Sequence, residues 1–340
     1  MKFKFLSGLS LICALFPAIA QQKIMPQSAY ILPNAQKSVL TDIISVQGKF
    51  FMAAGERGHL LKSVNGQDWQ QSATPLQSNL NSVFFLNEQL GWAVGHDASI
   101  VHSNDGGLTW SLQQFAPELD KPLFDVVFND AQNGIAVGAY GMFYRTTDGG
   151  KQWQSEFHPE LASIEDQALL AELKESDPEA YAIEASSVLP HFNRLFADGN
   201  VLFMVGEAGF YASSHDFGRT WQRENSFYNG SLFGITRTGQ GNLFAIGLRG
   251  HAFRSTDLGV TWQKIDLPSP STLNSVLAVE DKVFLFGNAG TLLMSSDDGV
   301  SFKAIKAPDG KSILNGVLVG PQLVLATETG IKSVQAVVAE

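Results

Sequence analysis

The chain contains 340 residues, carries a formal net charge of −10 at pH 7 and has a single cysteine, Cys13. An acidic protein of this kind repels nucleic acid and anionic lipid, so neither is expected as a partner. One cysteine cannot form an internal disulfide or a multi-cysteine metal site. We therefore expect stability to come from packing alone, with no metal and no cofactor.

The first twenty residues have the order of a secretory signal peptide. Lys2 and Lys4 precede an apolar run over residues 9–19, and small residues lead to a cleavage site after Ala20. The run is about half as long as the roughly 20 residues that a membrane-spanning helix needs. We therefore expect a signal peptide over residues 1–20.

A lipid anchor is the alternative for this segment, but the residues before Cys13 lack the small residue that a lipoprotein signal requires. Removing the two leader lysines changes the net charge from −10 to −12. We expect a monomeric mature chain over residues 21–340 without a transmembrane anchor. Its expected location is the periplasm or the cell exterior, or the thylakoid lumen in a photosynthetic organism.

Two short patterns then recur seven times each, about forty residues apart. One is an apolar pair followed by glycine and a short loop, as in AVGHDA. The other comprises LTDI, LNSV, LFDV, FNRL, LFGI, LNSV and LNGV, which end at Ile43, Val83, Val126, Leu195, Ile235, Val276 and Val317. Periods near forty residues made of short β segments are typical of propeller blades.

A third pattern, S/T-x-D-x-G-x-T-W, is that of an Asp-box. Its third position is occupied by Asn65, Asp105, Asp148, Asp216, Asp257 and Asp297, at steps of 40, 43, 68, 41 and 40 residues. Its tryptophans are Trp69, Trp110, Trp153, Trp221 and Trp262. Six boxes beside seven copies of the other patterns predict an all-β, seven-bladed propeller, a single domain over residues 21–340, whose last blade lacks its final hairpin.

Each repeat is predicted to form four antiparallel strands, for example LNSVFF, GWAVG, SIVHS and TWSLQQ around Trp92. A ring of such sheets must close or leave an open sheet edge. We expect residues 28–32 to supply the missing outer strand of the last blade.

The boxes are predicted to be turns between the third and fourth strands. The carboxylate accepts hydrogen bonds from nearby N–H groups, the glycine takes a positive φ, and the tryptophan packs beneath neighbouring strands. Evenly spaced aspartates could also suggest catalysis or calcium binding, but box turns sit at the outer edges of separate blades, too far apart to share an ion. We interpret the box residues as structural.

The opposite face is the predicted recognition surface, and we call it the loop face. It carries the loops between second and third strands and the connections between consecutive blades. The candidate partner-binding residues are Glu56, Arg57, His96, Asp97, Tyr140, Arg194, Glu207, Arg249, Asn288 and Glu328. Arginine and tyrosine are common interface anchors. The alternative is a rim of solvated loop tips whose ion pairs contribute little.

The 68-residue step contains an insertion over about residues 157–187. Residues 160–185 are expected to be helical up to Pro178, with apolar residues at helix-like spacing. Eight acidic residues and one lysine, Lys174, lie in this stretch. Two arrangements stay open: an acidic helix docked over the channel mouth that offers a partner a negative surface, or a solvated helix without function.

Asp-boxes also occur in sialidases and other glycosidases. Sialidase chemistry uses six blades and three arginines that clamp a carboxylate, whereas seven blades are predicted here and few arginines can reach the channel. Two carboxylates among Asp97, Glu207 and Glu328 could in principle serve a glycosidase. The sequence has no serine elbow, zinc-protease motif or P-loop. We expect no enzyme activity, with a glycan-binding protein or sialidase-like glycoside hydrolase as the alternative.

The segment LNSVFFLNEQLGWAVGHDASIVHSNDGGLTW, residues 80–110, is similar to repeats of the photosystem II stability/assembly factor family. The likeness extends over about residues 40–334. It implies a lumenal or periplasmic, non-enzymatic factor that binds a subunit of a membrane protein complex through arginines on one face. Arg57, Arg249 and Arg194 are the candidates here, and the acidic insertion departs from the family. The implied partner is a membrane-complex subunit, photosystem II being one candidate, or an envelope transporter.

Overall fold

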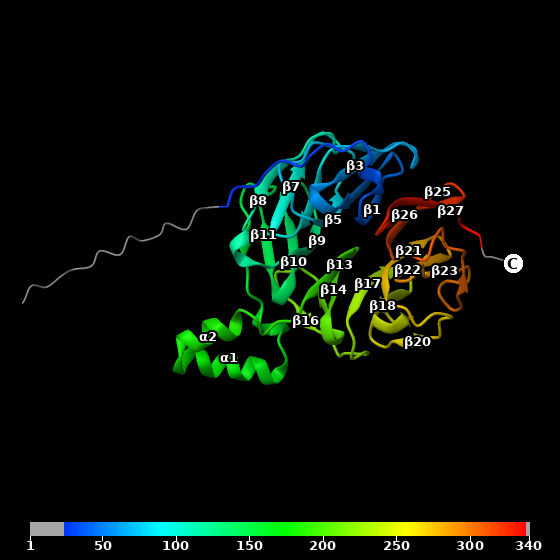
Figure 1. The fold of residues 1–340 in the computed structure, drawn as a ribbon. Helices are drawn as coiled ribbons and strands as arrows, with labels where there is room; N and C mark the ends of the chain where they lie inside the picture. The colour runs from blue at the N-terminus through cyan, green and yellow to red at the C-terminus, as the bar shows by residue number, and fades with distance from the viewer. Residues whose placement is uncertain (1–23, 338–340) are drawn as a thin grey trace, which may run out of the picture.

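The computed structural model describes residues 24–337, so the expected signal peptide lies outside the described residues. Seven antiparallel sheets are arranged in a ring, which confirms the seven-bladed propeller (Figure 1). Six of the sheets have four strands, and the last has three. We number the blades 1 to 7 in chain order.

The innermost strands surround the central channel. Each packs against the innermost strands of the two neighbouring blades, and the contact between blades 7 and 1 closes the ring. These strands are β1 (Leu40–Val46), β5 (Leu80–Phe85), β9 (Leu123–Phe128), β13 (Phe192–Asp198), β17 (Leu232–Arg237), β21 (Leu273–Val279) and β25 (Ile313–Val319).

The second strands are almost completely buried because neighbouring blades pack on both of their faces, which explains their continuous apolar sequences. They are β2 (Phe50–Gly55), β6 (Gly91–Gly95), β10 (Gly134–Gly138), β14 (Val201–Gly206), β18 (Leu243–Gly247), β22 (Lys282–Gly287) and β26 (Gln322–Thr327). The third strands are β3 (Leu60–Ser63), β7 (Ser99–Ser103), β11 (Phe143–Thr146), β15 (Tyr211–Ser214), β19 (Ala252–Ser255), β23 (Leu292–Ser295) and β27 (Gly330–Gln335).

The outermost strands are short and mostly exposed. They are β4 (Gln70–Gln71), β8 (Ser111–Gln114), β12 (Gln154–Ser155), β16 (Gln222–Arg223), β20 (Gln263–Ile265) and β24 (Lys303–Ala304). In blade 2 the four strands coincide closely with the four segments that the sequence predicts. Blade 7 has no such strand among the described residues, in agreement with its missing box.

Aromatic side chains fill the wedges between blades. The ring of Trp92 in blade 2 stacks on that of Phe128 in blade 3, with centroids 3.5 Å apart. Trp110 meets Phe85 edge to face, and Phe85 in turn meets Phe50 of blade 1 edge to face. Such pairs add about 0.5–1.5 kcal/mol to the burial of the rings, so they hold neighbouring blades in register.

The prediction for residues 28–32 is wrong. This segment runs along blade 1, where the Leu32 N–H donates to Gln71 Oε1 (2.9 Å) and the Ala29 N–H donates to the Thr74 carbonyl (3.1 Å). The following residues, Ala35–Lys37, pack on β27. The N-terminal segment therefore crosses the joint between the first and last blades without forming a fourth strand in blade 7. The side chain of Gln71, at the edge of blade 1, forms hydrogen bonds with the backbone of this N-terminal segment.

The insertion forms two helices rather than one. Helix α1 (Ile164–Ser176) begins after Ser163, whose side chain accepts a hydrogen bond from the Asp166 N–H. Helix α2 (Pro178–Ala185) differs from the expectation that helical structure ends at Pro178. Proline suits the first position of a helix, where its missing N–H costs nothing, and Asp177 caps α2.

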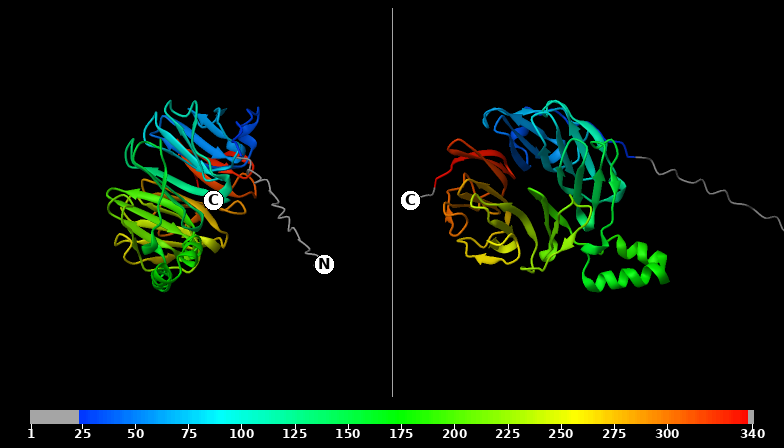
Figure 2. Two further views of the ribbon diagram at one scale, coloured as in Figure 1. Left: turned by 90° about the vertical axis from the view of Figure 1, so that its left-hand side faces the viewer. Right: turned by 180° about the vertical axis from the view of Figure 1, so that it is seen from behind.

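The two helices pack on each other and project from the side of the ring (Figures 1 and 2). The arrangement in which a helix covers the channel mouth is therefore wrong. We call this insertion, residues 157–187, the acidic arm. Within residues 24–337, no helix has the length and apolar character needed to cross a membrane.

Candidate functional site

The turns between second and third strands build the loop face. In four blades the turn is a short 3-10 segment whose middle residue has a left-handed backbone, with φ of 56° at Arg57, 51° at Tyr140, 52° at Ala208 and 56° at Arg249. This conformation costs a non-glycine residue roughly 1–2 kcal/mol. Because it recurs in four blades, it belongs to the turn rather than to one strained site. It turns the middle side chain outward, and all four of these residues are exposed.

Five of the ten predicted loop-face residues are engaged with neighbouring loops of the protein itself. Each binds a neighbouring chain segment close to the start of an innermost strand or of the connection before it. Glu56 accepts from the Val39 N–H (3.2 Å), Glu207 from the His191 N–H (3.4 Å), Asn288 from Asn274 Nδ2 (2.9 Å) and Asp97 from the Ser78 hydroxyl, and Glu328 Oε1 lies 3.6 Å from Lys311 Nζ. These side chains therefore hold the loops in place.

The two arginines of the loop face are not engaged in this way. Within residues 24–337, neither Arg57 nor Arg249 forms an ion pair or a side-chain hydrogen bond, although both backbone N–H groups do donate. Both side chains are exposed, as is that of His96. Arg57 belongs to blade 1 and Arg249 to blade 5, so the two cations stand on opposite sides of the channel mouth and do not form one patch.

Tyr140 lies apart from both arginines, on blade 3. Its ring meets His191 edge to face, with centroids 4.5 Å apart, and Lys121 Nζ lies 5.2 Å from its centroid. The side chain remains 49% exposed, so its upper surface is open to a partner.

Arg194 is not on the outer loops. It is the third residue of β13, in the wall of the channel, and its Nη1 lies 3.4 Å from Asp125 Oδ1 of blade 3. Burial raises the pKa of Asp125, while the guanidinium of Arg194 acts in the opposite direction. The structure thus removes Arg194 from the set of free loop-face cations.

Two buried aspartates in the innermost strands, Asp42 and Asp125, join blades together. Asp125 accepts from the Ser82 hydroxyl of blade 2 and from the Leu195 N–H of blade 4, both at 2.8 Å. Asp42 accepts from the Val83 N–H of blade 2 and from a side-chain amide of blade 7. Sequence reasoning missed these residues, although LTDI and LFDV carry an acidic residue where the other copies have serine, arginine or glycine.

In four blades the second position of the innermost-strand pattern is polar and has the same purpose. Its side chain donates to a carbonyl at the start of the next blade's innermost strand. This bond links two neighbouring innermost strands, which belong to separate sheets. These bonds are Thr41 Oγ1 to Leu80 O (2.5 Å), Asn81 Nδ2 to Leu123 O (2.7 Å), Asn193 Nδ2 to Leu232 O (2.9 Å) and Asn274 Nδ2 to Ile313 O (2.9 Å). The recurrent asparagine is therefore part of the ring's construction.

The channel keeps a cavity of about 600 Å³ between blades 4 to 7 and blade 1. Its polar lining includes Arg194, Thr236, Ser275 and Asn315. The Ser275 hydroxyl donates to Asn315 Oδ1 (2.6 Å), and Arg194 contacts Asp125. Some polar side chains of the channel wall therefore bind one another in addition to lining the cavity.

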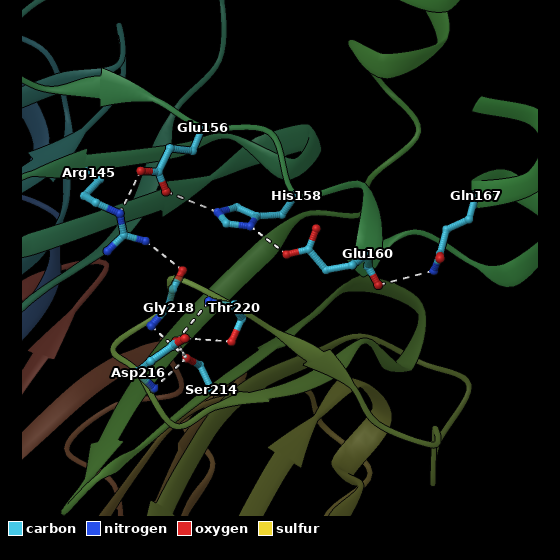
Figure 3. A network of polar contacts seen from close by, with 9 residues as sticks. All are labelled: Arg145, Glu156, His158, Glu160, Gln167, Ser214, Asp216, Gly218 and Thr220. Carbon is cyan, nitrogen blue, oxygen red and sulfur yellow. Dashed lines mark hydrogen bonds and ion pairs between the residues drawn. The ribbon is translucent and has the colours of Figure 1, made fainter. Parts of the chain in front are cut away.

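The box turns lie on the opposite face and bind their own backbone. At Asp216 the carboxylate accepts from the Thr220 N–H (2.9 Å) and hydroxyl (2.7 Å), while the Ser214 hydroxyl accepts from the Gly218 N–H (2.7 Å) (Figure 3). Asp105, Asp257 and Asp297 have equivalent bonds, and Asp148 has a reduced set. Asn65 accepts from the N–H groups of Gln67 and Asp68. No group of three or more His, Cys, Asp or Glu side chains in residues 24–337 is arranged to hold a metal ion.

A chain of polar side chains fixes the acidic arm to the propeller (Figure 3). Arg145 donates to Glu156 (2.7 Å) and to the carbonyl of Gly218 in the blade 4 box turn (2.7 Å). The ring nitrogens of His158 lie 3.3 Å from Glu156 Oε2 and 2.9 Å from Glu160 Oε1. The start of the arm is thereby tied to both blade 3 and blade 4.

Comparison with known proteins gives a family likeness in part of the sequence. The sequence model of the family described as Photosynthesis system II assembly factor YCF48 matches residues 61–121, which comprise the whole of blade 2 and the outer part of blade 1. No curated protein matches the chain.

Solved structures match over nearly the whole propeller. A structure described as YCF48 bound to D1 peptide is 21% identical, with a TM-score of 0.65, and the match covers 94% of this chain and 98% of that one. YCF48 from Cyanidioschyzon merolae is 17% identical, with a TM-score of 0.65 and coverages of 91% and 98%. An ancestral GH74 enzyme is 14% identical, with a TM-score of 0.64, and the match covers 91% of this chain and 46% of that one.

At these identities the structural matches show the fold alone, and 1333 chains share it, so fold by itself does not select a function. The family match rests instead on the sequence of the repeat around Trp92, the same segment that carries the resemblance within residues 80–110. The likeness to the photosystem II assembly factor family of seven-bladed propellers is therefore confirmed, in the sequence of residues 61–121 and in the fold of the whole ring.

Proposed function

We propose that the protein is a non-enzymatic binding factor that holds a segment of a membrane-complex subunit on its loop face. The family likeness supports this role, and one similar structure contains a bound peptide. The order of charged, apolar and small residues over residues 1–20 supports action outside the cytoplasm, in the periplasm or the thylakoid lumen. The subunit belongs to photosystem II or to an envelope complex such as a transporter.

The main observation behind the proposal is that the carboxylates and the arginines of the loop face differ in their contacts. Its carboxylates are tied to the protein's own loops, whereas the guanidinium groups of Arg57 and Arg249 are exposed and without partners among residues 24–337. Arginine forms two-pronged hydrogen bonds with carboxylates. A polar or acidic segment lying across the channel mouth can reach both arginines, which selects partners by charge and fixes their orientation.

Capture from crosslinked envelope extracts tests the proposal. The mature protein should recover one dominant membrane-complex partner, and the double variant Arg57→Glu with Arg249→Glu should lose it. The matched control is Lys151→Glu with Arg219→Glu, which makes the same charge change at exposed positions of box turns. Absence of a partner, or equal recovery by the loop-face variant and the wild type, would contradict the proposal.

A glycan-active protein is the second candidate, favoured by the fold likeness to an ancestral GH74 enzyme and by the acidic residues around the channel mouth. The engagement of Asp97 and Glu207 in loop contacts weakens it. Chromogenic glycosides and glycan arrays separate the two functions. Turnover that disappears in Glu207→Gln or Asp97→Asn would replace the first proposal with this one.

A further inference from the structure

The acidic arm is anchored at both of its ends. At its start, Leu161 and Ala162 are buried in the core between blades 3 and 4, and Arg223 donates to the Leu161 carbonyl (2.9 Å). At its end, Leu189 is buried, and Lys121 Nζ donates to the Ser186 carbonyl (2.7 Å). Although the helices project into solvent, these contacts hold them in a fixed position relative to blade 3.

A groove of about 490 Å³ lies between α2 and blade 3. Its floor and walls are rich in aromatic and apolar side chains, namely Leu119, Tyr140, Met142, Tyr144, Phe157 and Tyr181. Leu119, Tyr140 and Phe157 are 41%, 49% and 36% exposed, which is unusual for side chains of this size gathered at one place. Because Tyr140 belongs to both, the groove is continuous with the loop face.

The groove lies beside the acidic arm, whose net charge is strongly negative. Residues 160–185 carry eight acidic side chains and one lysine, a balance of −7. The lining itself contains one carboxylate, Glu156, which is paired with Arg145, and one cation, Lys121, whose ammonium group is directed at the Ser186 carbonyl. A basic segment is therefore attracted to this surface, whereas an acidic one is repelled.

We propose that this groove binds a large apolar or aromatic side chain within a basic segment of the protein partner. The inference rests on the proposed function and adds the chemistry of a second contact to it. A second copy of this chain is a poor occupant, because each mature copy carries a net charge of −12, that is, −10 less the two leader lysines, and the two arms would repel each other. Together, the arginines of the loop face and the acidic arm require a partner with an acidic or polar stretch followed by a basic, apolar one.

Peptide binding to the mature chain tests this chemistry directly. Three fluorescent peptides are compared by anisotropy: lysines alternating with phenylalanine and leucine, lysines alternating with glycine and serine, and glutamates alternating with phenylalanine and leucine. We expect the first peptide to bind at least about tenfold more tightly than either of the others. The peptide with glycine and serine lacks the apolar anchor, and the peptide with glutamates lacks the charge attraction. Equal binding of the two lysine peptides would overturn the proposal.

Two matched variants locate the site. Ala182 is an exposed residue of α2 that lines the groove, and Ala171 is an exposed residue of α1 outside its lining. Ala182→Arg fills the groove, while Ala171→Arg makes the same charge change on the same arm. We expect Ala182→Arg to weaken the lysine–phenylalanine peptide by about tenfold and Ala171→Arg to weaken it by about twofold or less. If both variants weaken peptide binding equally, the peptide is attracted by the charge of the arm and does not occupy the groove. That result would overturn the proposal.

Capture from envelope extracts separates this inference from the proposed function. If Ala182→Arg reduces partner recovery and Ala171→Arg does not, the groove contributes to the same interaction. If recovery is lost with Arg57→Glu and Arg249→Glu but unchanged with Ala182→Arg, the proposed function stands and the groove inference fails.

Discussion

The innermost strands and the loop face both carry arginine and acidic side chains, but they use them differently. In the channel wall, Arg194 lies against Asp125, and Asp125 also accepts hydrogen bonds from the two neighbouring blades. On the loop face, Arg57 and Arg249 are exposed and lack partners among residues 24–337. A buried charge must be satisfied internally, whereas an exposed one need not be. The comparison separates charges that build the ring from charges that remain available to a partner.

The largest expected effect comes from breaking the channel pair. Asp125→Ala leaves the Arg194 guanidinium, the Ser82 hydroxyl and the Leu195 N–H without their acceptor. We expect the free energy of unfolding to fall by about 3–5 kcal/mol, measured by urea denaturation. The double variant Asp125→Leu with Arg194→Met removes both charges and should lose clearly less. A loss below about 1 kcal/mol for Asp125→Ala would show that the pair does not join the blades.

A smaller loss is expected in a box turn. Ser103 is buried, and its hydroxyl accepts from the Gly107 N–H (2.8 Å) and donates to Asp105 (2.8 Å). Ser103→Ala should lower the free energy of unfolding by about 1–2 kcal/mol without affecting partner capture. The control is Ser111→Ala, at an exposed serine of the same blade, which should stay within about 0.5 kcal/mol of the wild type. Reduced capture by Ser103→Ala at full stability would move the binding surface to the box turns.

The box turns should also make stability depend on acid pH. The hydroxyl and N–H of Thr261 and the Ser255 hydroxyl donate to Asp257 and lower its pKa to about 2. The pKa values of Asp105, Asp216 and Asp297 are also about 2, because hydrogen bonds outweigh a desolvation that acts in the opposite direction.

Since these folded-state values lie below those of the unfolded chain, their stabilisation is complete above about pH 4 and is lost as the pH falls from about 4 to about 2. Thermal melts across this range should show a falling melting temperature, with a shallower fall in Asp257→Asn. A melting temperature that is constant from pH 5 to about pH 2 would contradict this account.

The smallest effect on stability is expected on the loop face. Arg57→Ala and Arg249→Ala should each leave the free energy of unfolding within about 0.5 kcal/mol of the wild type, because neither side chain has a partner among the described residues. Urea denaturation measures this. A loss above about 1 kcal/mol would place these arginines with the structural charges of the channel.

The repeating parts of the fold could be predicted from sequence, since three patterns in the same register define the blades independently of one another. The path of residues 28–32 could not, because it depends on single hydrogen bonds that Gln71 accepts and donates rather than on a repeat. Helix α2 was missed because proline both ends and begins helices, and only the capping by Asp177 shows which applies.

The candidate site could be predicted only as a set of positions. Sequence placed Arg57 and Arg249 on loops between second and third strands, which is where they lie. It could not show that Glu56 and Glu207 are tied to backbone N–H groups, because these contacts depend on how a connection folds against its neighbouring turn. Arg194 lies in the channel wall rather than on the loop face, as its place in the innermost-strand segment FNRL indicates.

Lysine-specific crosslinking to the captured partner, read by mass spectrometry, tests the central claim most directly. Lys121 and Lys311 lie in connections between blades on the loop face, whereas Lys49 and Lys151 lie in turns, and Lys282 at the start of β22, on the opposite face. We predict partner crosslinks at Lys121 and Lys311. Crosslinks confined to Lys49, Lys151 and Lys282 would show that the partner binds the face that carries the box turns, and would contradict this account.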